Sequence, residues 1–150
     1  AKPVNAVQPM ARAVCQLRFV VGTEMDDIVP ALRRHLAREG FDKVVVTSDD
    51  SPMFTATRLD PDHPWAVWTA QSIERTMGAP AMVVPNLGGS LPNEEFAATL
   101  GMPTIWIPHS YTGCSQHAPN EHALKPILRE GLAVMAGVWW DLGAGDTPKL

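Results

Sequence analysis

Residues 15–47, with the sequence CQLRFVVGTEMDDIVPALRRHLAREGFDKVVVT, hold the pattern that decides the expected fold. Apolar and polar side chains alternate over residues 15–21, which is the period of a half-buried strand. Acidic residues at 26–27 can start a helix, and Gly40 is placed to end it. The valine run at 44–46 is typical of a further strand. The stretch therefore predicts a strand, a helix and a strand, joined by a right-handed crossover on one sheet.

The composition of the 150 residues excludes several classes of protein. Apolar residues make up 45% of the chain and charged residues 19%, so neither a disordered chain nor a coiled coil is expected. The net charge is −4 and no basic run is present, which argues against nucleic acid as a partner. No apolar stretch approaches the roughly 20 residues of a membrane helix, and no signal-peptide pattern is present, so no membrane partner is expected.

The chain has two cysteines, Cys15 and Cys114, which cannot form a disulfide framework and have no C-x-x-C spacing. Free thiols are typical of a reducing compartment. A cytoplasmic location is therefore expected.

A chain of this length predicts one domain by size alone. However, helix breakers and small acidic residues gather over residues 48–64, as in a connection between two units. We therefore expect two pieces, residues 1–57 and residues 58–150.

The second piece alternates helix and strand patterns. A helix capped by Asp62 is expected to end at Gly78, and a short helix capped by Asn93 to end at Gly101. Strands are expected at residues 81–84 and 104–107.

The last helix is expected to start near Asn120 or Glu121. Its apolar stripe is the clearest helical pattern in the chain: Leu124, Ile127, Leu128, Leu132, Met135 and Val138. Strands alternating with helices predict an α/β fold, with ligands bound by the loops that follow the strands.

The loop after residues 104–107 gathers side chains that bind metals, attack as nucleophiles or carry protons: His109, Cys114, His117, Asn120, Glu121 and His122. Three interpretations stay open: a solvated polar loop, a zinc ion held by His117 with ligands from elsewhere, or a Cys114 thiolate activated by His117. Catalytic zinc needs three protein ligands and an open position, so one loop supplies only part of such a site.

Three motifs resemble one enzyme family. The run GCSQHAPNE at residues 113–121, followed by an amphipathic helix, resembles the C-terminal motif of the dizinc metallopeptidases that include aminoacylase, carnosinase, carboxypeptidase G and succinyl-diaminopimelate desuccinylase. The run GGSLP at residues 88–92 resembles a Gly-Gly-Ser-Ile-Pro loop of the carnosinase-like branch. Residues 3–7, PVNAV, and Gln16-Leu17-Arg18 resemble the lid-domain segments of that family, in which an Asn and an Arg also lie thirteen residues apart. The motifs follow the order of the family across nearly the whole chain.

The resemblance implies roles for individual residues. His117 would be the last zinc ligand, and Glu121 would orient the loop that carries it. Simple helix capping by Asn120 and Glu121 is the alternative for these two residues.

Asn5 and Arg18 would bind the carboxylate of the substrate or stabilise the oxyanion, because a guanidinium offers a two-pronged donor. Gly88, Gly89 and Ser90 would contact the substrate, the glycines through closely approaching main-chain amides and the serine through its hydroxyl. A solubilising role for Arg18 and a tight turn at the glycines are the structural alternatives.

The resemblance also implies the architecture. Residues 1–57 would be the second, β-α-β half of a ferredoxin-like lid and dimerisation domain, and residues 58–150 the C-terminal α/β part of a zinc-peptidase catalytic domain. The His-x-Asp, bridging Asp and Glu-Glu elements of that family have no matching context in this sequence. We therefore expect the chain to be inactive by itself.

The complete enzyme would use two zinc ions to hydrolyse an amide bond beside a free carboxylate, in a dipeptide or an N-acyl amino acid. It would form a homodimer through the lid. Two other functions remain open: a non-catalytic carboxylate-binding or dimerisation module, and a thiol hydrolase that uses Cys114 and His117.

Overall fold

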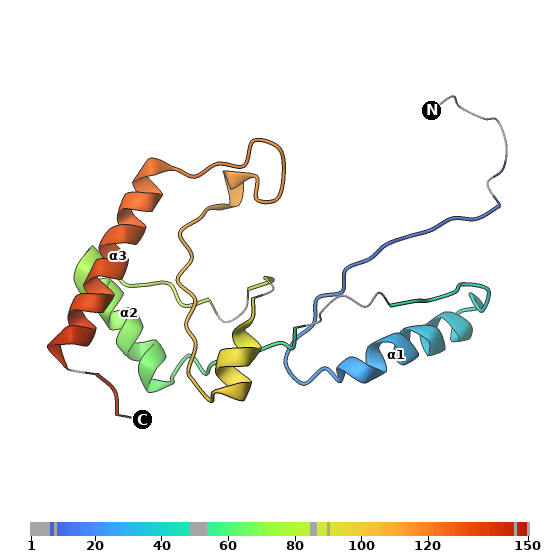
Figure 1. Ribbon diagram of the computed structural model, residues 1–150, viewed down its shortest axis with the longest axis horizontal. Helices are drawn as coiled ribbons and strands as arrows, with labels where there is room; N and C mark the ends of the chain where they lie inside the picture. Colours follow the sequence, from blue (N-terminus) through green and yellow to red (C-terminus); the bar gives the residue numbers. More distant parts are fainter. Residues whose placement is uncertain are drawn as a thin grey trace.

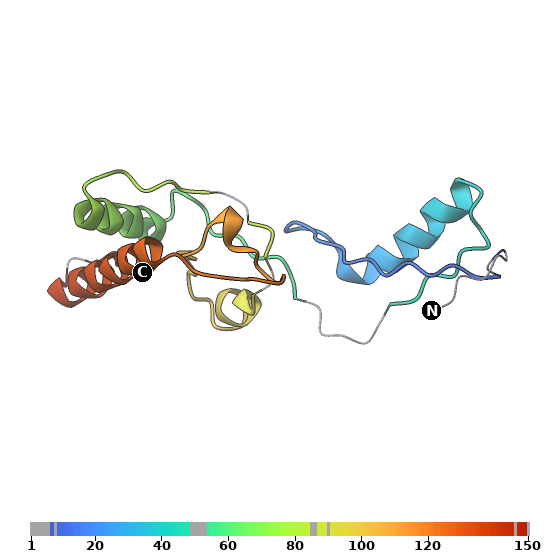
Figure 2. The same cartoon turned by 90° about the horizontal axis from the view of Figure 1, so that it is seen from above.

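The computed structural model describes residue 7 and residues 9–48, 54–84, 87–89, 91–145 and 147–149. Five helical elements follow one another along the chain: α1 (Met25–Arg38), α2 (Pro64–Met77), the π-helix η1 (Glu95–Thr99), the 3₁₀ helix η2 (Thr112–Cys114) and α3 (Lys125–Ala144). Helices α2 and α3 lie side by side at one end of the molecule, and α1 lies at the other end (Figures 1 and 2). Among the described elements, α2 and α3 are the only pair in contact.

The expected α/β fold is wrong, because the described part of the chain contains no strand. The four segments expected as strands, residues 15–21, 41–47, 81–84 and 104–107, are irregular. A strand is stable only where a neighbour accepts and donates its main-chain hydrogen bonds, and side-chain alternation cannot supply that neighbour. The expectations of a ferredoxin-like half-domain and of the α/β part of a catalytic domain are therefore both wrong. The described residues form helices joined by irregular segments. The division into residues 1–57 and 58–150 stays a prediction.

Helix α1 forms where the sequence predicts it. Its first turn carries Asp26 and Asp27, whose negative charges suit the positive end of the helix dipole. The Arg34 guanidinium holds the Asp27 carboxylate at 2.9 Å, and Gly40 adopts the left-handed conformation (φ +81°) after the last turn. None of its residues is buried, and α1 contacts no other described helix.

Helix α2 ends at Gly78 (φ +71°), as expected, but its cap is His63 and not Asp62. The His63 Nδ1 accepts a hydrogen bond from the Trp65 N–H at 3.2 Å. Pro64 at the start of the helix needs no hydrogen-bond acceptor there. The His63 imidazole nitrogen therefore caps α2 in place of the Asp62 carboxylate that the sequence predicts.

Helix α3 begins at Lys125, and not near Asn120 or Glu121 as expected. Its buried residues Gly131, Val134 and Val138 form one stripe, and the buried residues of α2 are Trp68, Thr69 and Ser72. The Arg75 guanidinium joins the two helices by binding the Asp141 carboxylate at 2.7 Å. The α2–α3 pair is thus joined by this ion pair and by the close approach of Gly137 to Thr76.

The η1 segment is tied to the linker that precedes α2. The Glu94 carboxylate accepts a hydrogen bond from the Thr55 N–H at 2.9 Å. This bond, followed by that of the Thr55 hydroxyl, lowers the pKa of Glu94. Gly101 follows η1 in the left-handed conformation (φ +65°), which confirms the expected helix stop.

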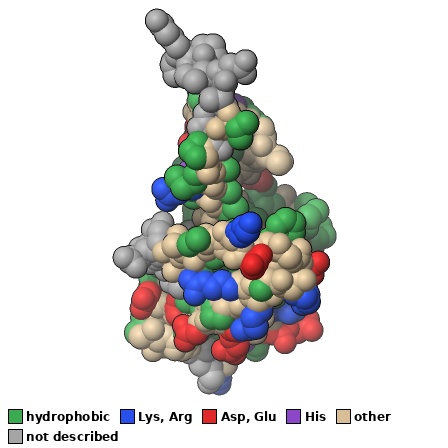
Figure 3. Space-filling model, turned by 90° about the vertical axis from the view of Figure 1, so that its right-hand side faces the viewer, with side chains coloured by type: hydrophobic (Ala, Val, Ile, Leu, Met, Phe, Trp, Pro, Cys, Tyr) green, Lys and Arg blue, Asp and Glu red, His purple; other side chains and the backbone are tan. Residues whose placement is uncertain are grey.

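The chain exposes an unusually large surface. It presents 12710 Å² to solvent, whereas a compact monomer of its 16.3 kDa exposes about 7,500 Å². Hydrophobic side chains lie beside charged ones on the face at the α1 end (Figure 3). Large apolar residues are exposed on α3 as well, among them Leu132, Trp139 and Trp140. None of the described helices is long and apolar enough to cross a membrane.

The ion pair between Arg75 of α2 and Asp141 of α3 predicts how stability changes at acid pH. Interaction with the Ser72 hydroxyl, and then with the Arg75 guanidinium, lowers the pKa of Asp141 below 3.8. Between that lowered pKa and 3.8 the unfolded state binds more protons, so stability rises with pH. As pH falls through this window, the contribution of Asp141 is lost.

Asp141→Asn should therefore lower Tm at neutral pH and flatten its decline below pH 3.8. Thermal melts followed by circular dichroism between about pH 2 and 7 measure this, with Asp42→Asn as a control. An unchanged acid slope in Asp141→Asn would contradict the assigned role of the ion pair.

Candidate functional site

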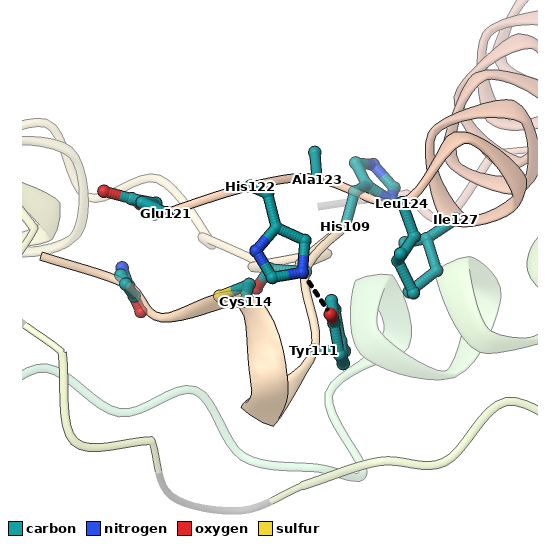
Figure 4. Close-up of a pocket in the computed structure, with 10 residues that line it drawn as sticks. His109, Tyr111, Cys114, Glu121, His122, Ala123, Leu124 and Ile127 are labelled. Carbon is teal, nitrogen blue, oxygen red and sulfur yellow. Dashed lines mark hydrogen bonds between the residues drawn. The ribbon is translucent and has the colours of Figure 1, made fainter. Parts of the chain in front are cut away.

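The loop between η2 and α3 encloses a cavity of about 360 Å³ (Figure 4). Ten residues line it: His109, Ser110, Tyr111, Cys114, Gln116, Glu121, His122, Ala123, Leu124 and Ile127. The polar ones come from the loop that the sequence singles out, and Ile127 comes from the first turns of α3. The cavity is thus lined by both polar and apolar side chains.

The His122 ring makes two hydrogen bonds within this site. Its Nδ1 lies 2.9 Å from the Asn120 carbonyl, and its Nε2 lies 2.6 Å from the Tyr111 hydroxyl (Figure 4). Because a carbonyl can only accept, Nδ1 carries the proton, and in the neutral ring Nε2 accepts from the tyrosine hydroxyl. The two rings also meet edge to face, with centroids 5.8 Å apart.

The loop that carries His117 has an unusual backbone. Ser115, His117 and Asn120 all adopt the left-handed conformation, with φ of 57°, 60° and 64°. This conformation is uncommon for residues other than glycine, and it persists only where surrounding contacts impose it. Such clusters are typical of functional sites.

Glu121 supplies one of these contacts. Its carboxylate accepts a hydrogen bond from the His117 main-chain N–H at 3.2 Å. The alternative role of helix capping for Asn120 and Glu121 is wrong, because α3 starts at Lys125 after the N-cap Leu124. Glu121 therefore contacts the segment that it is expected to orient, and its functional role stays a prediction.

His117 is exposed, and the described residues include no group of three or more metal-ligating side chains. A catalytic zinc site needs three protein ligands. The donor set on the described chain therefore does not fit a complete zinc site, and His117 would have to share the ion with ligands from other polypeptide. The role of His117 as a ligand stays a prediction.

Arg18 and Gly88, which lie 70 residues apart in the sequence, meet in the structure. The Arg18 guanidinium donates to the Gly88 carbonyl and lies 3.4 Å from the Gln16 side-chain oxygen. At Gly89, an added Cβ would come within 2.8 Å of the Trp106 ring, so a larger residue there would require that ring to move. Residues of the two motifs expected to contact the substrate are thus brought together.

Asn5 and Ser90, which the sequence assigns to the same site, lie outside the described residues. Cys114 is buried in the cavity wall, and its carbonyl accepts from the His122 N–H at 3.0 Å. The sequence interpretation missed the pairing of Tyr111 with His122. The only signal for it is that the single tyrosine of the chain lies in the histidine-rich loop.

No known family model, curated protein or solved structure matches this chain. The family resemblance therefore depends on the three motifs and on the contacts that their residues make.

Proposed function

We propose that this chain is the C-terminal portion of a metal-dependent hydrolase that cleaves an amide bond beside a free carboxylate, in a dipeptide or an N-acyl amino acid. The observation that carries the proposal is the contact between the Arg18 guanidinium and the Gly88 carbonyl. It joins two motifs that the resemblance assigns to substrate binding, although they belong to separate parts of the chain.

Arg18 is suited to bind a carboxylate. A guanidinium has five N–H donors in a planar fork, so contacts to Gly88 and Gln16 leave further donors for a ligand. The neighbouring Gly88 and Gly89 are exposed and carry no side chains, so a ligand can approach their main chain closely. Asn5 would add an amide donor to the same carboxylate.

His117 would contribute one metal ligand. Its exposed position suits an ion shared with another part of the protein, and the Glu121 carboxylate holds its main chain. A bound divalent ion would supply an activated water and stabilise charge on the reacting carbonyl. The remaining ligands and the general base would come from outside this chain, which explains our expectation that it is inactive alone.

The large exposed surface supports the larger assembly. The chain exposes 12710 Å², about 5,000 Å² more than a compact monomer of its mass, and this excess exceeds what a standard protein interface buries. Further polypeptide of the same protein would cover part of it, and a second copy docked on residues 1–57 would form the homodimer. Two free cysteines favour the cytoplasm as its compartment.

The metal role of His117 can be tested on the protein expressed with whatever coding sequence precedes Ala1. We expect upstream His-x-Asp and Glu-Glu elements, and a zinc content that falls by half or more in His117→Ala. Removal of one ligand from a three-ligand site costs most of the affinity. Metal analysis after dialysis provides the measurement.

His35→Ala is the matched control, because His35 is an exposed histidine on α1, away from the loop. It should leave the zinc content unchanged. Unchanged zinc in His117→Ala, or an upstream sequence without acidic and histidine metal motifs, would reject the hydrolase and leave a carboxylate-binding module as the better interpretation. Loss of activity in Cys114→Ser with insensitivity to chelators would instead indicate a thiol hydrolase.

A further inference from the structure

The loop of residues 114–122 is closed on itself by contacts at its two ends. The His122 main-chain N–H donates to the Cys114 carbonyl at 3.0 Å, and the Cys114 N–H donates to the Tyr111 carbonyl at 3.1 Å. Between these ends the chain passes through the left-handed residues Ser115, His117 and Asn120. A backbone of this kind needs contacts that favour it over the extended alternatives.

The His122 side chain supplies two such contacts with one ring. Nδ1–H donates to the Asn120 carbonyl at 2.9 Å, inside the loop, and Nε2 accepts from the Tyr111 hydroxyl at 2.6 Å, outside it. The ring therefore fixes the left-handed Asn120 relative to Tyr111, which precedes the 3₁₀ helix η2. Figure 4 shows the hydroxyl of Tyr111 directed at this ring.

The adjacent residue extends the same restraint to His117. Glu121 precedes His122, and its carboxylate accepts the His117 main-chain N–H at 3.2 Å. Fixing the His122 ring therefore also restrains the adjoining backbone from which the Glu121 side chain reaches the His117 N–H.

We propose that Tyr111 and His122 are positioning residues that hold the loop of residues 114–122 in its left-handed conformation and so fix where His117 is presented. The metal that His117 would bind rests on the proposed function; the positioning itself does not. The pair acts through hydrogen bonds and needs no ligand in place.

The test compares hydrogen exchange of the main-chain amides of His117, Ala118 and Glu121, which are hydrogen-bonded within the loop, in the full chain and in single variants. Tyr111→Phe keeps the ring and removes only the hydroxyl, so exchange in the loop should rise about tenfold, the factor equivalent to loss of one typical hydrogen bond. Amides of α2 and α3 should exchange as before, which separates positioning from general destabilisation.

A pair of substitutions at His122 gives the rescue arm. His122→Gln keeps an acceptor within reach of the Tyr111 hydroxyl and should stay within about threefold of wild type, whereas His122→Leu should match or exceed Tyr111→Phe. Arg129→Ala, at an exposed position of α3 outside the cavity lining, should leave exchange in the loop unchanged.

A second readout follows the His117 main chain directly. In a fixed loop its amide gives one sharp NMR signal, and in Tyr111→Phe this signal should shift or broaden as the backbone samples more conformations. Unchanged exchange in Tyr111→Phe, or an equal rise over α3 and the loop, would overturn the proposal. Because neither measurement uses metal or substrate, failure of the hydrolase proposal would leave this result intact.

Discussion

Trp68→Ala is expected to destabilise the α2–α3 pair. Trp68 lies on α2, is 8% exposed and is the largest of the buried hydrophobic side chains that the structure describes. Truncation of a buried tryptophan costs about 3–5 kcal/mol, through lost burial and the cavity left behind. Among the described helices, α2 and α3 are the only pair in contact, so no third helix supports α2. The free energy of unfolding, measured by urea titration of the helical circular dichroism signal, should fall by this amount.

Trp140→Ala removes the same side chain from the surface of α3. Trp140 is 80% exposed, so its loss should change the free energy of unfolding by less than about 0.5 kcal/mol. Trp68 also meets the Trp65 ring edge to face at 5.5 Å, a contact that Trp140 does not share. Equal losses in the two variants would contradict the assignment of the core to the α2–α3 contact.

The helices are the part of the fold that the sequence predicts well, because their signals are local. Gly40 and Gly78 end α1 and α2 with a left-handed backbone, and both stops were readable from the sequence. The start of α3 was misplaced because Asn120 and Glu121 resemble capping residues. In the structure Asn120 is left-handed, Glu121 binds the His117 N–H, and Pro126 lies in the first turn of the helix.

The predicted strands do not form in the described residues, and the reason is non-local. Alternation at residues 15–21 specifies which side chains could share a face, but a sheet needs a second backbone at hydrogen-bonding distance. At residues 41–47, the Val46 carbonyl accepts instead from the Arg33 guanidinium at 2.8 Å. A side chain of α1 thus takes a main-chain acceptor that a neighbouring strand would have used.

The candidate site shows the same difference between contacts that are local in sequence and contacts that are not. A motif identified His117 and Glu121, which are four residues apart and in contact through the His117 N–H. The Tyr111–His122 hydrogen bond spans eleven residues and exists only because the intervening loop closes. The contact of Arg18 with Gly88 spans 70 residues, and residue order within motifs gives no measure of such a distance.

Gly137→Ala is expected to force α2 and α3 apart. A Cβ at Gly137 would lie 2.0 Å from the Thr76 hydroxyl oxygen and 3.0 Å from the Thr76 Cβ. Thr76 cannot turn away freely, because it is β-branched and its hydroxyl donates to the Ser72 carbonyl at 3.1 Å. Overpacking of this kind costs about 1–3 kcal/mol, which outweighs the gain of about 1 kcal/mol that alanine brings to a helix. Urea titration should show the net loss.

The same helix offers the control and the rescue. Gly143 has no atom within 4 Å of an added Cβ, so Gly143→Ala should raise the free energy of unfolding by up to about 1 kcal/mol. Thr76→Ala removes the obstructing hydroxyl and methyl groups, so Gly137→Ala should be much less harmful in the double variant than alone. A stabilising Gly137→Ala, or additive effects of the two substitutions, would show that the helices do not meet at this glycine.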